Sequence, residues 1–388
     1  MPDAVKLSQE LIRCPSVTGT DAGVINILAE TVKKSGFQCD ILEFSGDNSY
    51  PVINLHALYN PKNSKNILYF AGHTDVVPAG DEKMWRFNPF SAQIDNNILY
   101  GRGAVDMKCA IAAFVSAADE FIAENKDSDF AIGLLITGDE EAEAINGTKK
   151  MLDWMKQNNK TMSACIVGEP TNPEKVGQMI KIGRRGSINF NLKITGKQGH
   201  VAYPHNADNP ITTLVNILKL LKDHKLDSGN QFFDPSNLEV THINSENLGS
   251  NVIPEHAQAN FNIRFNNQHS GNSLIEFINY LCSKTAGKDN FQLNYRISGE
   301  SFINSDPDLS AIAVEAVKNK SGINPELSTS GGTSDARFIK DFCPVIEFGL
   351  INKTAHQINE HVSVSNIYLL KEIYKELLVF YFRGYIKN

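Results

Sequence analysis

Residues 132–143 read IGLLITGDEEAE, an apolar run that stops at a glycine and is followed at once by Asp139, Glu140 and Glu141. A short apolar run closed by glycine and polar residues is typical of a strand buried in a parallel sheet. The stretch therefore predicts a buried strand whose carboxyl end carries three acidic side chains in succession.

Three further runs have the same form and lie at residues 67–71 (ILYFA), 164–167 (ACIV) and 345–348 (VIEF). Between the first of these and residues 132–136, the segment 107–124 carries apolar residues at helical spacing. A strand, a helix and a second strand in this order favour parallel pairing with helices covering the sheet. We predict an α/β fold, with a mostly parallel sheet flanked by helices.

The middle of the chain has a different pattern. From about residue 181 to residue 296, alternating stretches such as INFNLKITG and QANFNIRF surround two helical stretches. This pattern predicts an inserted α+β domain that interrupts the α/β domain. We expect a catalytic domain in two segments, 1–180 and 298–388, and an inserted lid or dimerisation domain at 181–297.

Composition excludes several classes of protein. The 388 residues include 37 Lys and Arg against 44 Asp and Glu, a net charge of −7, which leaves no basic footprint for nucleic acid or anionic lipid. No apolar run approaches the roughly 18 residues of a membrane span, and the first residues lack a signal-peptide pattern. Six cysteines without a CxxC pair indicate reduced thiols. We expect a soluble, cytoplasmic protein.

Residue types that bind metals follow each predicted strand. His73 and Asp75 follow the first strand, Glu169 follows the third, and His356 comes shortly after the fourth. Asp106 stands at the start of the 107–124 helix, where a lone aspartate can also be a simple N-cap. Sites in open α/β sheets gather at the carboxyl ends of the strands, so these residues could converge.

The chemistry of this set favours hard or borderline divalent ions. Imidazole and carboxylate ligands without thiolates suit zinc or a similar metal, and two close ions need a carboxylate to bridge them. The sequence therefore predicts a metal centre at the carboxyl edge of the sheet.

Several stretches carry a family resemblance that spans nearly the whole chain. They read GHTDVVPAG, YGRGAVDMKCAIAA, TGDEEAEAINGT, VGEPT, GKQGHVAYPHNADNP, SGGTSDARF and TAHQINE. Together they resemble the co-catalytic zinc amidohydrolases, a family that includes aminoacylases, acetylornithine deacetylase and succinyl-diaminopimelate desuccinylase. The resemblance implies two zinc ions per subunit, for which cobalt can substitute.

The resemblance also implies a role for each of these side chains. One zinc ion would take His73 and Glu169, the other Glu141 and His356, and Asp106 would bridge them. Glu140 would be the general base that takes a proton from the attacking water and passes it to the leaving amine. Asp75 would orient the imidazole of His73.

Within the family, KIGRRGS, GHVAYPHNADNP and SGGTSDARF look most like the desuccinylase branch. That branch implies hydrolysis of N-succinyl-L,L-diaminopimelate, an anionic substrate for which arginine side chains are suited. The implied substrate-binding residues are Arg184, Ser187, Tyr203, Asn251 and Arg264 from the inserted domain, with Gly332 and Thr333 from the catalytic domain. Ser250 stands where most family members have a second asparagine.

Two further histidines, His200 and His356, have roles that the resemblance implies. His200 is similar to a family histidine that reaches into the partner's active site, which implies a functional homodimer formed through the inserted domain. His356 and His361 both lie near the end of TAHQINEH, and the family motif favours His356 as the ligand because it precedes Asn359 and Glu360.

Three alternatives stay open from the sequence. A sister amidohydrolase, such as an acetylornithine deacetylase or a dipeptidase, would share every metal ligand and differ only in its pocket. A non-enzymatic binding module on the same fold would be expected to have lost ligands. A serine hydrolase would need a GxSxG turn, which the sequence lacks.

Overall fold

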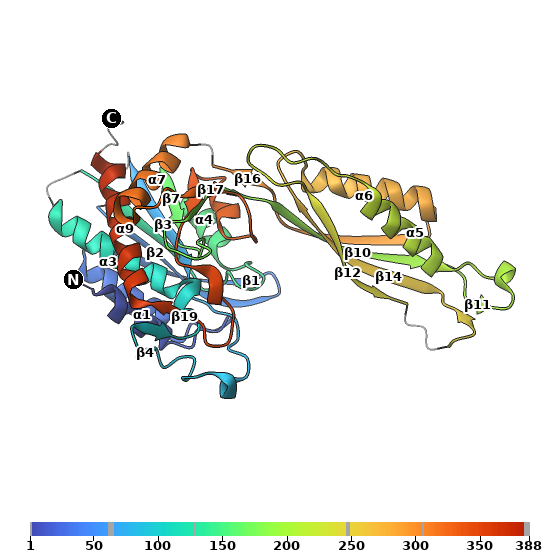
Figure 1. Cartoon of the computed structure of the whole chain (residues 1–388), viewed down its shortest axis with the longest axis horizontal. Coiled ribbons are helices and arrows are strands. Elements are labelled where there is room, and N and C mark those ends of the chain that lie inside the picture. Colours follow the sequence, from blue (N-terminus) through green and yellow to red (C-terminus); the bar gives the residue numbers. More distant parts are fainter. Residues whose placement is uncertain (1, 61–65, 127–128, 246–248, 305, 384–388) are drawn as a thin grey trace. The chain divides into compact units, whose positions relative to one another are not determined.

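The computed structural model describes residues 2–60, 66–126, 129–245, 249–304 and 306–383 (Figure 1). The chain forms two compact units. Unit 1 comprises Met1–Ile182, Asn304–Ser328 and Ser334–Asn388, and unit 2 comprises Gly183–Ile303 and Thr329–Thr333. The short segment Thr329–Thr333, which the sequence places in the second catalytic segment, thus groups with the inserted part of the chain.

Unit 1 is built on a mixed sheet of eight described strands. In sheet order these are β1 (Gln38–Gly46), β2 (Ser49–Tyr59), β6 (Ala131–Thr137), β3 (Ile67–His73), β7 (Ala164–Val167), β18 (Val345–Glu347), β8 (Met179–Lys181) and β17 (Glu326–Ser328). The strands β6, β3, β7 and β18 run parallel to their neighbours in this central group, whereas β1 pairs antiparallel with β2 and β2 antiparallel with β6. The predicted α/β class is confirmed, with antiparallel pairings on both sides of the parallel centre, because β8 also pairs antiparallel with β18.

Helices cover both faces of this sheet. Successive residues of a strand point to opposite faces, and on one face Phe70 stacks on Phe114 of α3, with ring centroids 4.4 Å apart, and meets Tyr374 of α9 edge-on. On the other face Tyr69 bonds to His56, whose ring packs against Trp154 of α4. The helices of unit 1 are α1 (Ala4–Ile12), α2 (Val24–Lys34), α3 (Cys109–Glu124), α4 (Thr148–Gln157), α7 (Pro307–Ser321), α8 (Ala336–Ile339) and α9 (Val364–Arg383).

Short elements complete unit 1. A small sheet joins β19 (His361–Ser363), β5 (Ile98–Tyr100) and β4 (Gln93–Asp95). Three helical turns occur at η1 (Glu82–Met84), η2 (Ala104–Lys108) and η4 (Asn352–Thr354), of which η2 leads directly into α3. No helix in the described parts of the chain is both long and apolar enough to span a bilayer.

Unit 2 is an antiparallel sheet with two helices on one face (Figure 1). Its strands lie in the order β12 (Asn237–Asn244), β14 (His256–Phe265), β10 (Gly186–Thr195) and β15 (Phe291–Gly299), and its helices are α5 (Pro210–Asp223) and α6 (Gly271–Ala286). Alternate residues of β14 are buried, as expected for a sheet covered on one side. Smaller pieces are β9 (Gly183–Arg184) with β16 (Phe302–Ile303), β11 (Gly199–His200) with β13 (Val252–Ile253), and the turn η3 (Pro204–Asn206).

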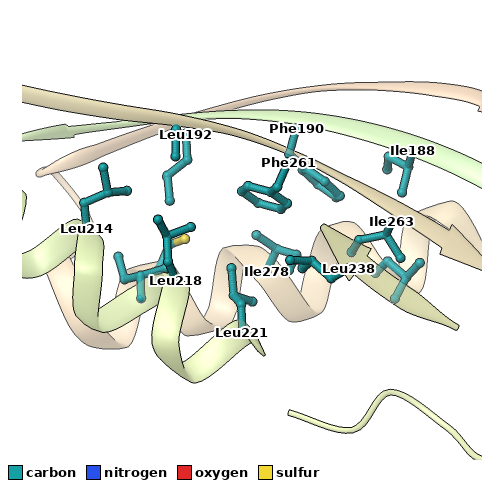
Figure 2. Packing of buried hydrophobic residues seen from close by; sticks show 14 of the residues in the cluster. Ile188, Phe190, Leu192, Leu214, Leu218, Leu221, Leu238, Phe261, Ile263 and Ile278 are labelled. Atoms are coloured by element: carbon teal, nitrogen blue, oxygen red, sulfur yellow. The ribbon is translucent and has the colours of Figure 1, made fainter. Parts of the chain in front are cut away.

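The core of unit 2 fills the space between the sheet and its two helices. Figure 2 shows Phe190 and Phe261 of neighbouring strands above Leu218 and Leu221 of α5 and Ile278 of α6. The two phenylalanine rings are stacked with centroids 5.0 Å apart. The residues of this core belong to unit 2 alone.

We expect Phe261→Ala to lower the free energy of unfolding by about 3–5 kcal/mol, because the change removes a ring that is 1% exposed and leaves a cavity. Urea titration followed by circular dichroism measures the loss. Tyr295→Ala is the matched control, since Tyr295 of β15 is 53% exposed, and its cost should stay below about 1 kcal/mol. Equal losses in both variants would contradict this description of the core.

Candidate metal centre

Three neighbouring parallel strands deliver acidic and imidazole side chains to one edge of the unit 1 sheet. His73 is the last residue of β3, Glu140 and Glu141 follow the end of β6, and Glu169 follows the end of β7. Every residue of β3, β6 and β7 is buried, so hydrophobic packing on both faces fixes the points at which these side chains emerge. The convergence predicted for the strand ends is present for these four residues.

Asp106 lies between two histidines that come from distant parts of the chain. Its Oδ1 is 3.1 Å from Nε2 of His73, and its Oδ2 is 3.2 Å from Nε2 of His356. Asp106 belongs to the turn η2 rather than to α3 itself, so its carboxylate is directed across the sheet edge and does not cap the helix. Each oxygen of one carboxylate therefore faces a different imidazole.

The remaining distances divide the cluster into two halves around Asp106. On one side Nε2 of His73 is 3.9 Å from Oε1 of Glu169, and on the other Nε2 of His356 is 2.9 Å from Oε1 of Glu141. Two sets of side chains each bring their donor atoms within 4.8 Å of one another. One set is His73, Glu140 and Glu169, and the other is His73, Asp106 and Glu141. His356 lies outside both sets, but its short distances to Glu141 and Asp106 favour it over His73 as the partner of Glu141.

The donor types and their charge fit a pair of divalent cations. All are imidazole nitrogens or carboxylate oxygens, as zinc centres without thiolates use, and one carboxylate presents its two oxygens to two separate groups of donors. Four carboxylates in one largely buried cluster also concentrate negative charge that a bound cation would neutralise. The described residues thus provide a suitable site for two metal ions.

The pKa values show how strongly these groups interact. Burial, followed by the charge of Glu169, raises the pKa of Glu140 well above its usual value. Burial alone would lower the pKa of His73, but the hydrogen bond to Asp106 and the charges of Asp106, Glu140 and Asp75 together outweigh burial and raise the pKa well above its usual value. Hydrogen bonds to Asp106 and then to Glu141 raise the pKa of His356 to about 10.

Asp75 contacts His73 in a different way from the expected one. The shortest bond from Nδ1 of His73 goes to the main-chain carbonyl of Asp75, at 2.9 Å, while the nearest carboxylate oxygen of Asp75 is 3.6 Å away. The carboxylate instead accepts the main-chain N–H groups of Glu140 and Glu141, each at 3.1 Å, and the hydroxyl of Thr18 at 2.9 Å. Asp75 therefore holds the acidic pair as well as lying beside the histidine.

Asp139 shapes the loop that carries the acidic pair. Its carboxylate accepts the main-chain N–H groups of Ile145 and Asn146 at 2.9 and 3.0 Å and the hydroxyl of Tyr50 at 2.6 Å. These bonds fix the conformation of the loop after β6. Asp139 therefore supports the loop and does not belong to the donor sets of the cluster. The structure thereby separates Asp139 from Glu140 and Glu141.

His361 points away from the cluster. Its Nδ1 bonds to the main-chain carbonyl of Asn359 at 2.7 Å, and its ring packs against Tyr100 with centroids 5.3 Å apart. His356 has a left-handed backbone with a φ of 62°, which turns its side chain toward Glu141. The geometry favours His356 over His361.

Three polar residues near the cluster, namely Asp335, Arg102 and Glu360, carry no role in the sequence analysis. Asp335 comes directly before α8, and the hydroxyl of Thr148, the first residue of α4, donates to it at 2.6 Å. Burial raises the pKa of Asp335 to about 6. Arg102 pairs with Glu360 in the interior at 2.7 Å. Sequence reasoning missed the pair because its members are 258 positions apart, although Arg102 stands within GRG and Glu360 ends the TAHQINE motif.

The candidate substrate-binding residues all belong to unit 2 and form two groups within it. Near the start of β10, Ser187 pairs in register with Arg264 of β14, and Arg184 donates to the carbonyl of Ser330 at 3.2 Å. Gly331 has a φ of +105°, and a Cβ there would lie 2.5 Å from the Arg184 guanidinium, so only glycine permits this approach. Gly332 and Thr333 follow in the same segment.

The second group lies beyond the far end of β10. His200 and Tyr203 have ring centroids 5.6 Å apart, and the main-chain N–H of Val201 donates to the carbonyl of Asn251 at 3.1 Å. The strand β10 separates this group from Ser187 by roughly 25–30 Å at 3.3 Å per residue. The two groups of unit 2 cannot contact one small substrate from the same chain.

The sequence pattern of the family described as Peptidase family M20/M25/M40 matches residues 69–379. The chain belongs to this family. A succinyl-diaminopimelate desuccinylase of Pelagibacter ubique is 50% identical over 97% of this chain and 98% of its own length. The enzyme of that name from Ehrlichia canis is 50% identical over 97% of each chain.

A solved structure supports the fold alone. An M20 family metallo-carboxypeptidase from Sulfolobus solfataricus superimposes with a TM-score of 0.77 at 19% identity, covering 98% of this chain and 99% of that one. Family membership and the named relatives identify the chain as a metal-dependent amidohydrolase. The readings as a binding module and as a serine hydrolase are thereby set aside.

Proposed function

We propose that the protein hydrolyses the amide bond of N-succinyl-L,L-2,6-diaminopimelate to give succinate and L,L-2,6-diaminopimelate, a step of diaminopimelate and lysine synthesis in the cytoplasm. The observation that carries the proposal is 50% identity over 97% of the chain to relatives named for this activity. The cluster at the carboxyl edge of the unit 1 sheet supports it with the residue types that the reaction requires.

The metal centre in this proposal contains two zinc ions, with cobalt able to replace them. His73 and Glu169 would hold one ion, His356 and Glu141 the other, and Asp106 would bridge them through the two oxygens that face the two histidines. Bound zinc lowers the pKa of water and polarises a carbonyl group.

Glu140 is the general base in the proposal. Its main-chain N–H is held by Asp75, so the side chain has a defined starting point beside His73 and Glu169. A carboxylate at this point could accept a proton from water and return it to the leaving amine. Glu141 cannot share this role because its carboxylate lies against His356.

The substrate's carboxylates would be bound by unit 2. Arg184 and Arg264, with Ser187, Gly332 and Thr333, form the group at the start of β10. Planar guanidinium groups bind carboxylates through two parallel hydrogen bonds, which suits a succinyl group. Tyr203, Asn251 and His200 would come from the partner subunit of a homodimer.

A surface of unit 2 supports the dimer. The strand β12 is an edge of the sheet, and edge strands offer unpaired main-chain groups to a second chain. Exposed apolar side chains lie on this strand and on α5, at Ile243, Val215 and Leu220, which are 57%, 52% and 48% exposed. A second copy of unit 2 would cover both features.

The activity is tested with purified, zinc-loaded protein. We expect hydrolysis of N-succinyl-L,L-diaminopimelate to exceed that of N-acetylornithine and of a simple dipeptide. Preference for one of the other amides would make the protein a sister amidohydrolase. The substrate-binding roles proposed for Arg184 and Arg264 would then be wrong. Hydrolysis of none of the three would reject the proposal.

We expect His356→Ala to lose about one zinc ion per subunit, because the change removes a ligand from the half of the cluster that contains Glu141. His361→Ala is the matched control and should keep its metal content, since His361 bonds to Asn359 and packs on Tyr100. Metal analysis after dialysis distinguishes the two. The opposite result would assign the ligand to His361.

A further inference from the structure

Glu360 lies in the interior next to Asp106 of the proposed metal centre. It is 0% exposed, and its Oε2 accepts from Nη1 of Arg102 at 2.7 Å. A buried ion pair stabilises a fold only weakly, because the loss of hydration offsets the attraction between the charges. The contacts of the pair with the main chain therefore matter more than the pairing itself.

The carboxylate of Glu360 holds the turn that carries Asp106. Oε1 accepts the main-chain N–H groups of Val105 at 2.7 Å and of Asp106 itself at 3.2 Å. Oε2 accepts the N–H of Gly103 at 3.1 Å in addition to Arg102. Three main-chain groups of one short turn thus bind to a single side chain.

Arg102 holds the segment that carries His356. Its Nη2 donates to the carbonyl of His356 at 3.4 Å, and its Nη1 donates to that of Gln357 at 3.3 Å. The main-chain N–H of Gly101 donates in turn to the carbonyl of Glu360 at 3.0 Å. The two segments are therefore linked in both directions, although more than 250 residues separate them in the chain.

We propose that the Arg102–Glu360 pair is a positioning device that sets the separation between Asp106 and His356, and thereby the affinity for the metal ion that these two residues hold with Glu141. The inference rests on the metal centre of the proposed function. His73 is the last residue of β3 and Glu169 follows the end of β7, so the sheet positions them without this pair. The ion on the His356 side depends on the pair, and the ion on the His73 side depends on it only through Asp106.

Glu360→Gln tests the device because a glutamine has the same shape but cannot satisfy the same partners. Each carboxylate oxygen of Glu360 receives two donors, namely Arg102 and Gly103 at Oε2 and Val105 and Asp106 at Oε1. In either orientation the amide NH₂ would face two N–H donors. In each orientation, the amide NH₂ therefore loses two hydrogen bonds, either those from Arg102 and Gly103 or those from Val105 and Asp106.

The measurement is the pair of zinc dissociation constants of the full-length protein, obtained by competition with a chelator of known affinity. We expect one constant to rise about 10–100-fold in Glu360→Gln, as for other residues that orient metal ligands, while the other changes less than about threefold. The absorption spectrum of the cobalt-loaded variant should show the altered site directly. Unchanged constants, or equal rises in both, would overturn the inference.

Asp227→Asn is the matched control. Asp227 of unit 2 also has a carboxylate with little exposure, 3% for its side chain, that accepts main-chain N–H groups from Gly229 and Ser236. It belongs to unit 2, whereas the proposed ligands belong to unit 1. The substitution should leave both zinc constants unchanged. A loss of zinc affinity equal to that of Glu360→Gln would mean that general loosening of the fold is responsible.

A second variant covers the case in which Glu360→Gln fails to fold. Arg102→Lys keeps the charge but removes the guanidinium contacts to His356 and Gln357, so it should weaken the same zinc constant. The zinc content and affinity of the wild-type protein distinguish failure of the proposed function from failure of this inference. Uptake of fewer than two zinc ions would reject the proposed centre and this inference with it, whereas two ions bound with the same affinity in wild type, Glu360→Gln and Arg102→Lys would reject the inference alone.

Discussion

Glu140→Gln should lower kcat by about 10²–10⁴-fold while the protein keeps its zinc, because the change removes the group that accepts and returns the proton but leaves the proposed ligands in place. The amide is close in size to the carboxyl group, and the bond from the Glu140 main-chain N–H to Asp75 is unaffected by the substitution. The steady-state rate with N-succinyl-L,L-diaminopimelate and the zinc content of the same sample provide the two readouts.

The matched control is Glu143→Gln in the same loop. Glu143 is exposed and lies outside the donor sets of the cluster, so the same chemical change should leave kcat within about twofold of wild type. A Glu140→Gln enzyme with nearly full activity would exclude Glu140 as the base. Loss of zinc together with activity would instead make Glu140 a ligand, a role that its closeness to His73 and Glu169 also permits.

The strand ends show which parts of the site can be predicted from sequence. The strands β3, β6 and β7 are buried on both faces, so they appear as uninterrupted apolar runs, and the residues that follow them must emerge at one edge. This argument places His73, Glu140, Glu141 and Glu169 together without any knowledge of the family. Asp106 and His356 lie in irregular segments, so residue type and position suggested only that they could converge, and the motif resemblance supplied their roles.

The strand β2 shows why other parts of the fold were missed. Its buried residues include Asn54 and His56, which interrupt the apolar pattern of SYPVINLHALY. Both are satisfied by tertiary partners, since Asn54 accepts from Thr137 and His56 bonds to Tyr69. A polar residue that is buried because of a distant partner cannot be recognised from local periodicity.

The role of Asp75 illustrates a further limit. Its position two residues after His73 predicts that its carboxylate faces the imidazole, and the two groups are indeed neighbours. The bonds to the N–H groups of Glu140 and Glu141 depend on how the loop after β6 turns, which is set by Asp139 and Tyr50. Chemistry at strand ends is predictable, whereas the hydrogen bonds that orient it come from packing.

His200→Ala should lower kcat by about 10²–10³-fold, because the imidazole is proposed to stabilise the oxyanion of the tetrahedral intermediate in the partner's active site. His205→Ala is the matched control, since His205 is exposed in the same loop and has no such role in the proposal. The roughly 25–30 Å between His200 and Ser187 along β10 supports action on the partner, because one chain's two groups cannot reach one substrate.

Mixed dimers test this action between subunits. Glu140→Gln and His200→Ala proteins, each almost inactive, are unfolded together, refolded and compared with the two proteins refolded separately. Half of the random dimers then contain one chain of each kind, and one of their two sites combines an intact Glu140 with the partner's intact His200, so about a quarter of wild-type activity should return. Activity that stays at the level of the separate variants would mean that His200 acts within its own chain.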